Sequence, residues 1–497
     1  MTTMTNTKEV LGVILGGALC ASVAVAQPDI GAQVRVNQDA TSTPQNETTA
    51  ASTDSAPERV LMAWNDYLIG NSKTGVGLSI DGGQTWATEL LRPAPQFQTS
   101  TEGDPMTASD NRNGRMWAGG ITFDSNGGMF VSRVEPGSTS FEPVVMAALN
   151  SVSPSGFIDK GWMAAGPDAL DPSNPSKTML YIAYNDGLIS SSDLGDTWTN
   201  PLGFGFGLGF LPRVTPDGTL YILGWDFGFN ISIWRSFNNG ATIQGPFHVA
   251  TRMDTWGADS SRFPGGFRVP ELAHLAVDPN DGSLSVVYPD TTNIVSGNRN
   301  VDLYFTRSTD QGANWTTPVI VNQSDSSPPG DSFFPWIEAD QNGRLHMVFH
   351  DSRNVAPQND NASPGWFDAY YSYSDDAGAT WNESRLTPSS FRSDQDGFGD
   401  GFLGDYHGIA AGGNTVYPLY VATSGANSAD VFTHAITSNP CVADLAEPFG
   451  VLDFSDVVAF LTAFGSGDPA ADLAPPAGVF DFSDVVAYLA AFGAGCP

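Results

Sequence analysis

Charged and hydroxyl-bearing side chains recur at the start of apolar, strand-like segments along the first 437 residues of the chain. They are Glu47, Asp104, Asp159 with Lys160, Arg213, Arg268 with Glu271, and Asp405 with Tyr406 and His407. Two carboxyl groups about 5–10 Å apart can serve glycoside hydrolysis, and a guanidinium binds a carboxylate through two parallel hydrogen bonds. These side chains can act together only if the fold brings the starts of the segments to one place.

A repeated pattern, S-x-D-x-G-x-T-W, indicates what that fold is. It occurs at residues 79–86, 191–198 and 374–381, at 308–315 with Asn314 in place of the threonine, and in altered form at 236–243. Its aspartate and glycine favour a tight turn, because aspartate accepts hydrogen bonds from nearby backbone N–H groups and glycine tolerates positive φ. The tryptophan can pack beneath this turn. Because these aspartates recur by repetition, we assign them to turn formation and not to catalysis.

The segments around each copy predict four antiparallel strands per unit. Residues 336–340 and 345–349 flank a turn, and residues 367–373 lead into the copy at 374–381. Four-stranded units repeated every 45–70 residues or so are typical of β-propeller blades. We therefore predict an all-β propeller over residues 27–437 with seven blades, six being the alternative. The last unit contains three strands, so we expect residues 32–36 to add the fourth and close the ring.

The repeated pattern resembles the Asp-box (BNR) repeats of sialidase-like propellers, and residues 267–270, Phe-Arg-Val-Pro, resemble a sialidase motif whose arginine helps to clamp the substrate carboxylate. For an active sialidase, the resemblance implies two more clamp arginines, an aspartate acid/base and a tyrosine nucleophile with a glutamate partner. The catalytic candidates are Arg268, Asp104, Glu271 and Tyr406. The ligand-binding candidates are Glu47, Asp159, Arg213, Asp405 and His407. Seven blades, and a Phe-Arg-Val-Pro motif that follows three boxes, depart from the sialidase pattern.

Residues 438–497 contain a duplicated segment that resembles a dockerin-like module, in which two calcium loops each lead into a helix. We predict the helices at residues 457–464 and 485–492. The candidate calcium ligands are Asp444, Asp453, Asp456, Asp472, Asp481 and Asp484. Calcium prefers six to eight oxygen ligands, and alanine or proline occupies two ligand positions in each loop. We therefore expect weak or no calcium binding, and the sequence suggests no other cofactor.

The N-terminus is typical of a secretory signal peptide. Lys8 precedes an apolar run that ends in Ala-Val-Ala, which predicts cleavage after Ala26 and loss of residues 1–26. A lipoprotein signal ending at Cys20 is the alternative. In an exported chain the two remaining cysteines, Cys441 and Cys496, are expected to form a disulfide. This predicts a bacterial protein that is secreted or held at the cell surface, and no later apolar run is long enough for a membrane span.

The charge of the chain restricts its partners. The 54 acidic residues against 21 basic ones give a net charge of −33, which argues against binding to nucleic acid. We expect the propeller to recognise an extracellular glycan or surface protein at the face where its first strands begin, and the tail to attach to a cell-surface partner. An exo-sialidase-type glycoside hydrolase acting on acidic sugars is one alternative. A structural cell-surface scaffold protein is the other.

Overall fold

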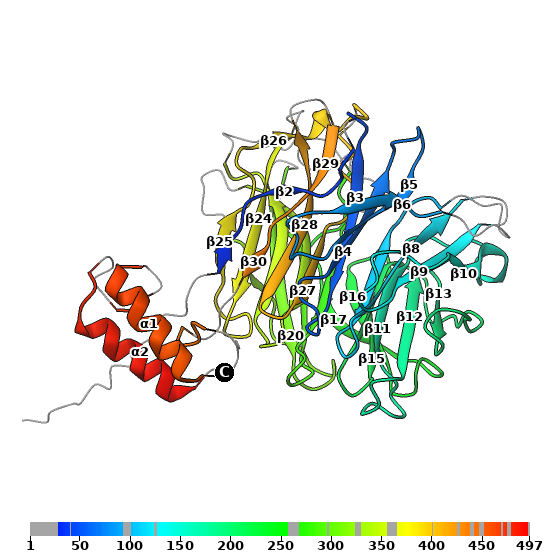
Figure 1. Cartoon of the computed structure of the whole chain (residues 1–497). Coiled ribbons are helices and arrows are strands. Elements are labelled where there is room, and N and C mark those ends of the chain that lie inside the picture. The colour runs from blue at the N-terminus through cyan, green and yellow to red at the C-terminus, as the bar shows by residue number, and fades with distance from the viewer. Residues whose placement is uncertain are drawn as a thin grey trace, which may run out of the picture. The chain divides into compact units, whose positions relative to one another are not determined.

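The computed structural model places the chain in two compact units, residues 28–438 and residues from 439 onward (Figure 1). The structure describes residues 28–39, 41–92, 101–123, 127–256, 268–295, 298–323, 330–354, 365–399, 401–424, 428–437, 442–446, 452–468, 471–474 and 479–495. The predicted signal peptide, residues 1–26, and the predicted Cys441–Cys496 disulfide lie outside the described residues.

Residues 28–438 form seven antiparallel sheets that follow one another along the chain, as predicted for a seven-bladed propeller. The first three blades comprise β3 (Gln45–Ser52), β4 (Val60–Asp66), β5 (Lys73–Ser79) and β6 (Ala87–Leu90), then β7 (Met106–Asp110), β8 (Arg115–Thr122), β9 (Gly128–Val134) and β10 (Val145–Leu149), then β11 (Trp162–Pro167), β12 (Thr178–Tyr184) and β13 (Gly187–Ser191). The next three comprise β14 (Leu208–Val214), β15 (Leu220–Trp225), β16 (Asn230–Ser236) and β17 (Gln244–Thr251), then β18 (His274–Val277), β19 (Leu284–Val295), β20 (Asn298–Ser308) and β21 (Val319–Ile320), then β22 (Ser332–Ala339), β23 (Leu345–Asp351), β24 (Trp366–Ser374), β25 (Asn382–Arg385) and β26 (Phe391–Arg392).

The seventh blade joins the two ends of the propeller. It comprises β27 (Gly408–Gly412), β28 (Thr415–Ser424) and β29 (Ser428–Thr433), to which β2 (Val34–Arg35) from the N-terminus pairs along β29. Beyond β2, the N–H of Val36 donates to the carbonyl of Val431 at 2.9 Å. A second short pair, β1 (Asp29–Ile30) with β30 (Ile436–Thr437), lies in the same sheet (Figure 1). The predicted closure is therefore present, and it covers the edge of β29 that would otherwise invite association.

The first strands of the blades form a closed ring around a central channel. Each of β3, β7, β11, β14, β18, β22 and β27 contacts the first strands of the two neighbouring blades, and β27 returns to β3. All seven strands run in the same sense along the channel, because each blade repeats one strand order. We call the end where they begin the mouth. The loops that join second to third strands, and fourth strands to the next blade, lie at this end.

The repeated S-x-D-x-G-x-T-W segments form the turns predicted for them, at the ends of the third strands of the blades that contain them. In the first copy, the carboxylate of Asp81 accepts hydrogen bonds from the N–H of Thr85 at 2.9 Å and the hydroxyl of Ser79 at 2.8 Å. Gly83 adopts a φ of 81°, and the indole N–H of Trp86 donates to its carbonyl at 3.1 Å. The same bonds recur in the copies that contain Asp193, Asp310 and Asp376.

Residues from 439 onward contain two helices, α1 (Phe454–Ser466) and α2 (Phe482–Ala494), which are longer than predicted. Each begins three residues earlier because its first turn has a capping box, in which Asp453 and Asp456, or Asp481 and Asp484, bond each other's backbone. The helices pack through stacked rings of Phe460 and Tyr488, whose centroids lie 4.0 Å apart. Among the described residues, no helix is long and apolar enough to cross a membrane.

Candidate functional site

Residues from the first, second, third and seventh blades, with one from the loop that leads into the fifth, meet at the channel mouth. We call this group the mouth cluster; it consists of Glu47, Asp104, Asp159, Lys160, Arg268, Asp405 and Tyr406. Six of these residues are candidates from the sequence, and the seventh, Lys160, follows the candidate Asp159 directly. The ring of first strands is what positions them, since each stands at or just before the start of such a strand.

A left-handed backbone conformation recurs at the start of these strands. Glu47, Asp104 and Lys160 adopt φ values of 53°, 50° and 44°, and Gly209 and Phe334 occupy the matching positions in the fourth and sixth blades with φ values of 65° and 52°. Only glycine enters this region without steric cost, so each other residue there stores about 1 kcal/mol of strain. Three of the four residues that bear this cost belong to the mouth cluster.

The carboxyl groups of the cluster lie close to one another. The Asp104 carboxyl hydrogen-bonds those of Glu47 and Asp159, and its Oδ2 accepts the N–H of Lys160 at 3.2 Å. Burial, reinforced by the charges of Asp104 and Asp405, raises the pKa of Glu47 well above its usual range. Burial and the charge of Asp104 raise the pKa of Asp159 to about 6. Asp159 can therefore hold or exchange a proton near neutral pH, and Glu47 keeps its proton more readily than a free carboxyl group.

Lys160 lies at the centre of these carboxyl groups. Its side chain is buried, and its Nζ lies 3.5 Å from the ring centroid of Trp162 and 3.6 Å from that of Tyr406. Burial lowers the pKa of Lys160 to about 8, although the surrounding carboxylates act in the opposite sense. The ammonium is therefore held where its charge is costly, which is typical of sites built for binding or catalysis and not for stability.

Arg268 and Tyr406 complete the cluster. The Arg268 guanidinium donates to Oδ2 of Asp405, and half of its side chain is exposed at the mouth. Burial outweighs this ion pair and raises the pKa of Asp405 to about 6. The Tyr406 hydroxyl donates to Oε2 of Glu47 at 3.3 Å, and burial followed by the charge of Glu47 raises the pKa of Tyr406 well above its usual value. Phe267, the first residue of the Phe-Arg-Val-Pro motif, lies outside the described residues.

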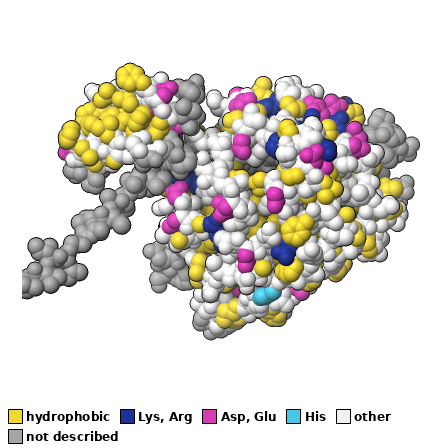
Figure 2. Space-filling model, turned by 90° about the horizontal axis from the view of Figure 1, so that it is seen from below, with side chains coloured by type: hydrophobic (Ala, Val, Ile, Leu, Met, Phe, Trp, Pro, Cys, Tyr) yellow, Lys and Arg dark blue, Asp and Glu magenta, His cyan; other side chains and the backbone are white. Residues whose placement is uncertain are grey.

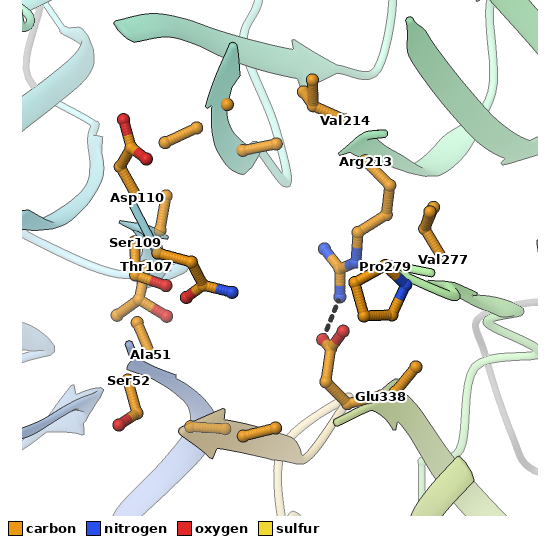
Figure 3. Close-up of a pocket in the computed structure, with 18 of the residues that line it drawn as sticks. Ala51, Ser52, Thr107, Ser109, Asp110, Arg213, Val214, Val277, Pro279 and Glu338 are labelled. Carbon is orange, nitrogen blue, oxygen red and sulfur yellow. Dashed lines mark hydrogen bonds and ion pairs between the residues drawn. The ribbon is translucent and has the colours of Figure 1, made fainter. Parts of the chain in front are cut away.

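Three candidates from the sequence do not join the cluster. Arg213 lines the channel further along and pairs with Glu338 at 3.3 Å. Glu271 is buried beneath the fifth blade, where it accepts the Thr255 hydroxyl at 2.7 Å. His407 is buried against Phe334 and His350. Glu271 and His407 stand just before first strands as expected, but their side chains are buried. The expectation that Arg213 stands at the start of a first strand is wrong, because β14 begins at Leu208 and Arg213 lies near its other end, beside Glu338 (Figure 3).

Supporting residues that sequence reasoning missed come from the ends of second strands. Asn65 donates to Oε2 of Glu47 at 2.8 Å, and the side-chain oxygen of Asn185 accepts the N–H of Asp159 at 2.9 Å. Tyr67, two residues after Asn65, lies near Glu47, and burial raises the pKa of Tyr67 to about 12. Asn65 and Asn185 occupy matching positions in the first and third blades, so alignment of the repeats would have been the signal.

An aromatic plug closes the channel behind the mouth cluster. It consists of Trp162, His274, Trp336 and Tyr406, all buried. The Trp162 ring lies 4.8 Å from that of Trp336 and 4.6 Å from that of Tyr406, and His274 lies 4.3 Å from Trp336. Lys160 contacts the plug from the mouth side, and the Arg213 guanidinium lies 5.7 Å from Trp336.

Among the described residues, Arg213, Arg268 and Arg353 do not form the clamp that a sialidase requires. Arg268 pairs with Asp405, Arg213 pairs with Glu338, and Arg353 pairs with Asp351 and Glu383. These three guanidinium groups have three separate sets of partners. The mouth cluster can therefore donate from Arg268 and Lys160, accept through its carboxylates, and exchange protons. It does not present three arginines to one carboxylate within the part of the chain that the structure describes.

Two of the six candidate calcium ligands, Asp456 and Asp484, bond the backbone of the C-terminal unit. Oδ1 of Asp456 accepts the N–H groups of Leu445 and Ala446 at 2.7 and 2.8 Å, and its Oδ2 accepts that of Asp453. Asp484 makes the same bonds in the second copy. Among the described residues, no three His, Cys, Asp or Glu side chains are grouped as a metal site would need. Weak or absent calcium binding stays a prediction.

The chain is a seven-bladed β-propeller, and comparison with known proteins adds only distant likenesses. No family model and no curated protein matches it. A Dyadobacter fermentans protein of unknown function is similar at 11% identity and a TM-score of 0.45, over 84% of this chain and 100% of the other. A variant of NanB sialidase from Streptococcus pneumoniae has 11% identity and a TM-score of 0.41, over 82% and 70%. A variant of the Aleuria aurantia lectin has 14% identity and a TM-score of 0.40, over 69% and 97%. None of these likenesses informs on activity.

Proposed function

We propose that this protein recognises an extracellular glycan at the mouth of its propeller. The observation that carries the proposal is the mouth cluster, in which hydrogen-bond donors and acceptors from β3 and four loops converge on one end of the channel. Arg268 is half exposed there and Asp104 and Asp159 are partly exposed. Adjacent donors and carboxylates suit a ligand with many hydroxyl groups, because each hydroxyl both donates and accepts.

Apolar side chains on the surrounding loops support this proposal. Large exposed hydrophobic residues are concentrated on the loops of the mouth end, namely Leu68, Ile69, Phe123, Leu149, Val152, Phe157, Phe206, Phe227, Phe229, Met253, Ile294, Trp366 and Phe398. The loops at the opposite end expose Ile80, Leu170 and Phe237. Exposed apolar side chains gathered around a polar centre mark interaction surfaces, and aromatic rings can pack on the C–H faces of sugars.

The double substitution Arg268→Ala with Asp104→Ala tests this site. We expect glycan binding, found by screening the full chain on a glycan array, to weaken more than about hundredfold, because two charge-assisted hydrogen bonds are lost. The melting temperature should change little, since Arg268 is exposed and Asp104 partly so. The matched control is Arg133→Ala with Asp196→Ala, which removes an ion pair of 2.7 Å away from the mouth. Unchanged binding in the first double variant would place recognition elsewhere.

A glycoside hydrolase is the second candidate, favoured by the hydrogen bond from Tyr406 to Glu47 and by two aspartates with pKa values of about 6. A carboxyl group with a pKa near the working pH can act as a general acid. Turnover of a fluorogenic sialoside, or of neutral fluorogenic glycosides, that is lost in Tyr406→Phe would support this candidate. Glycan binding without turnover would leave recognition as the function.

We propose further that the C-terminal unit attaches the protein to a cell-surface partner. Phe454, Val458 and Leu461 on α1, and the equivalent Phe482, Val486 and Leu489 on α2, lie four and three residues apart and are exposed. Figure 2 shows hydrophobic side chains gathered on one face of this unit. Exposed apolar faces of this kind mark protein interaction sites. The unit lacks lysine and arginine, so a partner with a basic rim would be complementary.

Substituting Phe454→Glu and Phe482→Glu should release the protein from the cell. Both residues are 76% exposed, so the fold should tolerate the change, whereas a partner would have to bury two new charges. We expect the wild-type chain to fractionate with the cell envelope of its own host and the variant to appear in the medium. Ser455→Glu with Ser483→Glu adds the same charge at exposed neighbouring positions and is the control. Equal retention of both variants would argue against this face.

A further inference from the structure

A loop rich in glycine and phenylalanine joins the sixth blade to the seventh at the mouth end of the channel. Its described residues are 396–399 and 401–405, which we call the aromatic loop. Four of its glycines adopt φ values between 81° and 93°, namely Gly397, Gly399, Gly401 and Gly404. Only glycine takes this conformation without steric cost, so the path of the loop depends on these four residues.

A single buried carboxylate, that of Asp396, holds the aromatic loop in place. Its Oδ1 accepts the N–H groups of Phe398 and Gly399 at 2.9 and 2.8 Å, and its Oδ2 accepts that of Phe402 at 2.6 Å. The carbonyl of Asp396 accepts the N–H of Ala429 on β29 at 3.1 Å. Asp396 is fully buried, and these bonds offset the cost of burying it. The backbone of both phenylalanines is therefore fixed to the seventh blade.

The two phenylalanine rings form a small aromatic surface together with Tyr67 of the first blade. The Phe398 ring centroid lies 4.9 Å from that of Tyr67 and 5.8 Å from that of Phe402. Phe398 is 38% exposed, and Tyr67 and Phe402 are half-buried. We call these three residues the aromatic rim.

The aromatic rim continues directly into the mouth cluster. The Arg268 guanidinium lies 5.7 Å from the Phe402 ring and donates to Asp405, the last residue of the aromatic loop. A Cβ added at Gly404 would lie 2.6 Å from the backbone nitrogen of Glu47, so the backbone of the loop packs against the cluster. A molecule that binds to Arg268 at the mouth therefore lies beside the aromatic rim.

The size of the aromatic rim favours a sugar ring over a protein as its occupant. Each aromatic side chain has about 150–250 Å² of surface, so three of them, none more than 38% exposed, offer less than about 300 Å². A stable protein interface needs about 800 Å² on each partner. A pyranose ring has a C–H face that can pack on an aromatic ring, and it has hydroxyl groups that can bond to Arg268 and Asp104.

We infer that the aromatic loop forms the second of two adjacent sugar subsites, so that the mouth binds an oligosaccharide of at least two pyranose rings. This inference rests on the proposed recognition of a glycan at the mouth. The hydroxyl groups of one ring bond to Arg268 and Asp104, and the C–H face of the next ring packs on Phe398 and Phe402. Asp396 is a positioning residue, because it fixes both phenylalanines before the sugar binds and so lowers the entropic cost of binding.

Ligand-observed NMR titration of the full chain with cellobiose, maltose, lactose and N,N′-diacetylchitobiose tests this inference. Each disaccharide is compared with its own monosaccharides, which are D-glucose, D-galactose and N-acetyl-D-glucosamine. We expect at least one disaccharide to bind at least tenfold more tightly than its monosaccharides. Phe398→Ala with Phe402→Ala should remove most of this difference, because the apolar surface that the second ring covers is lost. Binding of the monosaccharides should not change.

Asp396→Asn tests the positioning role. The amide keeps one acceptor oxygen, but its NH₂ group cannot accept the N–H of Phe402, so the preference for the disaccharide should fall severalfold. A merely structural role would weaken the binding of monosaccharides and disaccharides alike. Thermal unfolding shows whether this variant is folded, and if it is not, the double phenylalanine variant still decides the inference.

Phe237→Ala is the matched control. Phe237 is 40% exposed at the opposite end of the channel, and the Arg235 guanidinium lies 5.4 Å from its ring, so the preference for the disaccharide should persist. The inference would be overturned if no disaccharide bound, if monosaccharides bound as tightly, if the preference survived the loss of both phenylalanines, or if Phe237→Ala reduced it equally.

The glycan array separates failure of this inference from failure of the proposed function. If array binding is lost in Arg268→Ala with Asp104→Ala but the disaccharide preference is absent, recognition at the mouth stands and the aromatic loop is excluded as a subsite. If the wild-type chain binds no glycan on the array and no disaccharide in solution, both proposals are wrong.

Discussion

Lys160→Met is expected to raise the free energy of unfolding by about 2 kcal/mol at pH 7. A pKa of about 8 in the folded protein, against 10.5 for a free lysine, means that the charged ammonium costs the folded state about 3 kcal/mol. The contacts of Nζ with Trp162 and Tyr406 return about 1 kcal/mol of this cost. Methionine fills a similar volume without the charge, so the fold should gain while ligand binding at the mouth is lost.

The pH dependence of this gain gives a second readout. Between about pH 8 and 10.5 the folded wild type loses the Lys160 proton while the unfolded chain keeps its own, so the stability of the wild type rises with pH in that range. The advantage of Lys160→Met should therefore be full below pH 8 and disappear toward pH 10.5. Urea unfolding at several pH values measures this. Lys177→Met, at an exposed lysine, should show no such trend, and a less stable Lys160→Met at pH 7 would contradict the prediction.

Val36→Asp is expected to cost about 4 kcal/mol and to promote association. Val36 is fully buried, and its N–H holds the N-terminal strand on the seventh blade. An aspartate there must either be buried beside Trp64 and Val431 or detach the strand, and both outcomes lose the packing that closes the ring. Detachment uncovers β29, whose edge can then pair with another molecule.

Chemical unfolding and sedimentation together measure this effect. Arg35→Ala is the control, since Arg35 is the exposed neighbour on the same strand and its ion pair with Asp430 is a long 3.6 Å. We expect this variant to remain monomeric with nearly unchanged stability. If Val36→Asp were as stable and as monomeric as Arg35→Ala, closure by the N-terminal strand would not be what holds the ring together.

Most of the fold could be predicted from the sequence because its determinants are local. The S-x-D-x-G-x-T-W turns satisfy themselves, since Asp81 bonds residues within four positions of itself, and their spacing reveals the blades. Ring closure by the N-terminal strand could be predicted because the last repeat unit contains three strands and not four. The two helices of the C-terminal unit were predicted, but their predicted starts were three residues too late. The reason is that the capping boxes at Asp453 and Asp481 also resemble the carboxylates of a metal-binding loop.

The candidate site could be predicted only in part, because its chemistry depends on contacts between blades. The sequence placed Glu47, Asp104 and Asp405 at the starts of first strands, where the ring brings them together. It placed Arg213 at the start of a first strand, but β14 begins at Leu208, and Arg213 therefore lies near the other end of that strand with Glu338. It also could not show that His407 turns inward onto His350.

The sequence by itself thus determined a seven-bladed ring, the strand that closes it, and a charged mouth. Only the tertiary structure decided which charges lose water, and hence that Lys160 is buried on Trp162 and Tyr406, from two different blades, with a lowered pKa. The turns are stabilised by hydrogen bonds between residues a few positions apart, so the local sequence is enough to predict them. Desolvation and Coulomb interactions depend on distances between residues far apart in the chain, which exist only once the ring has closed.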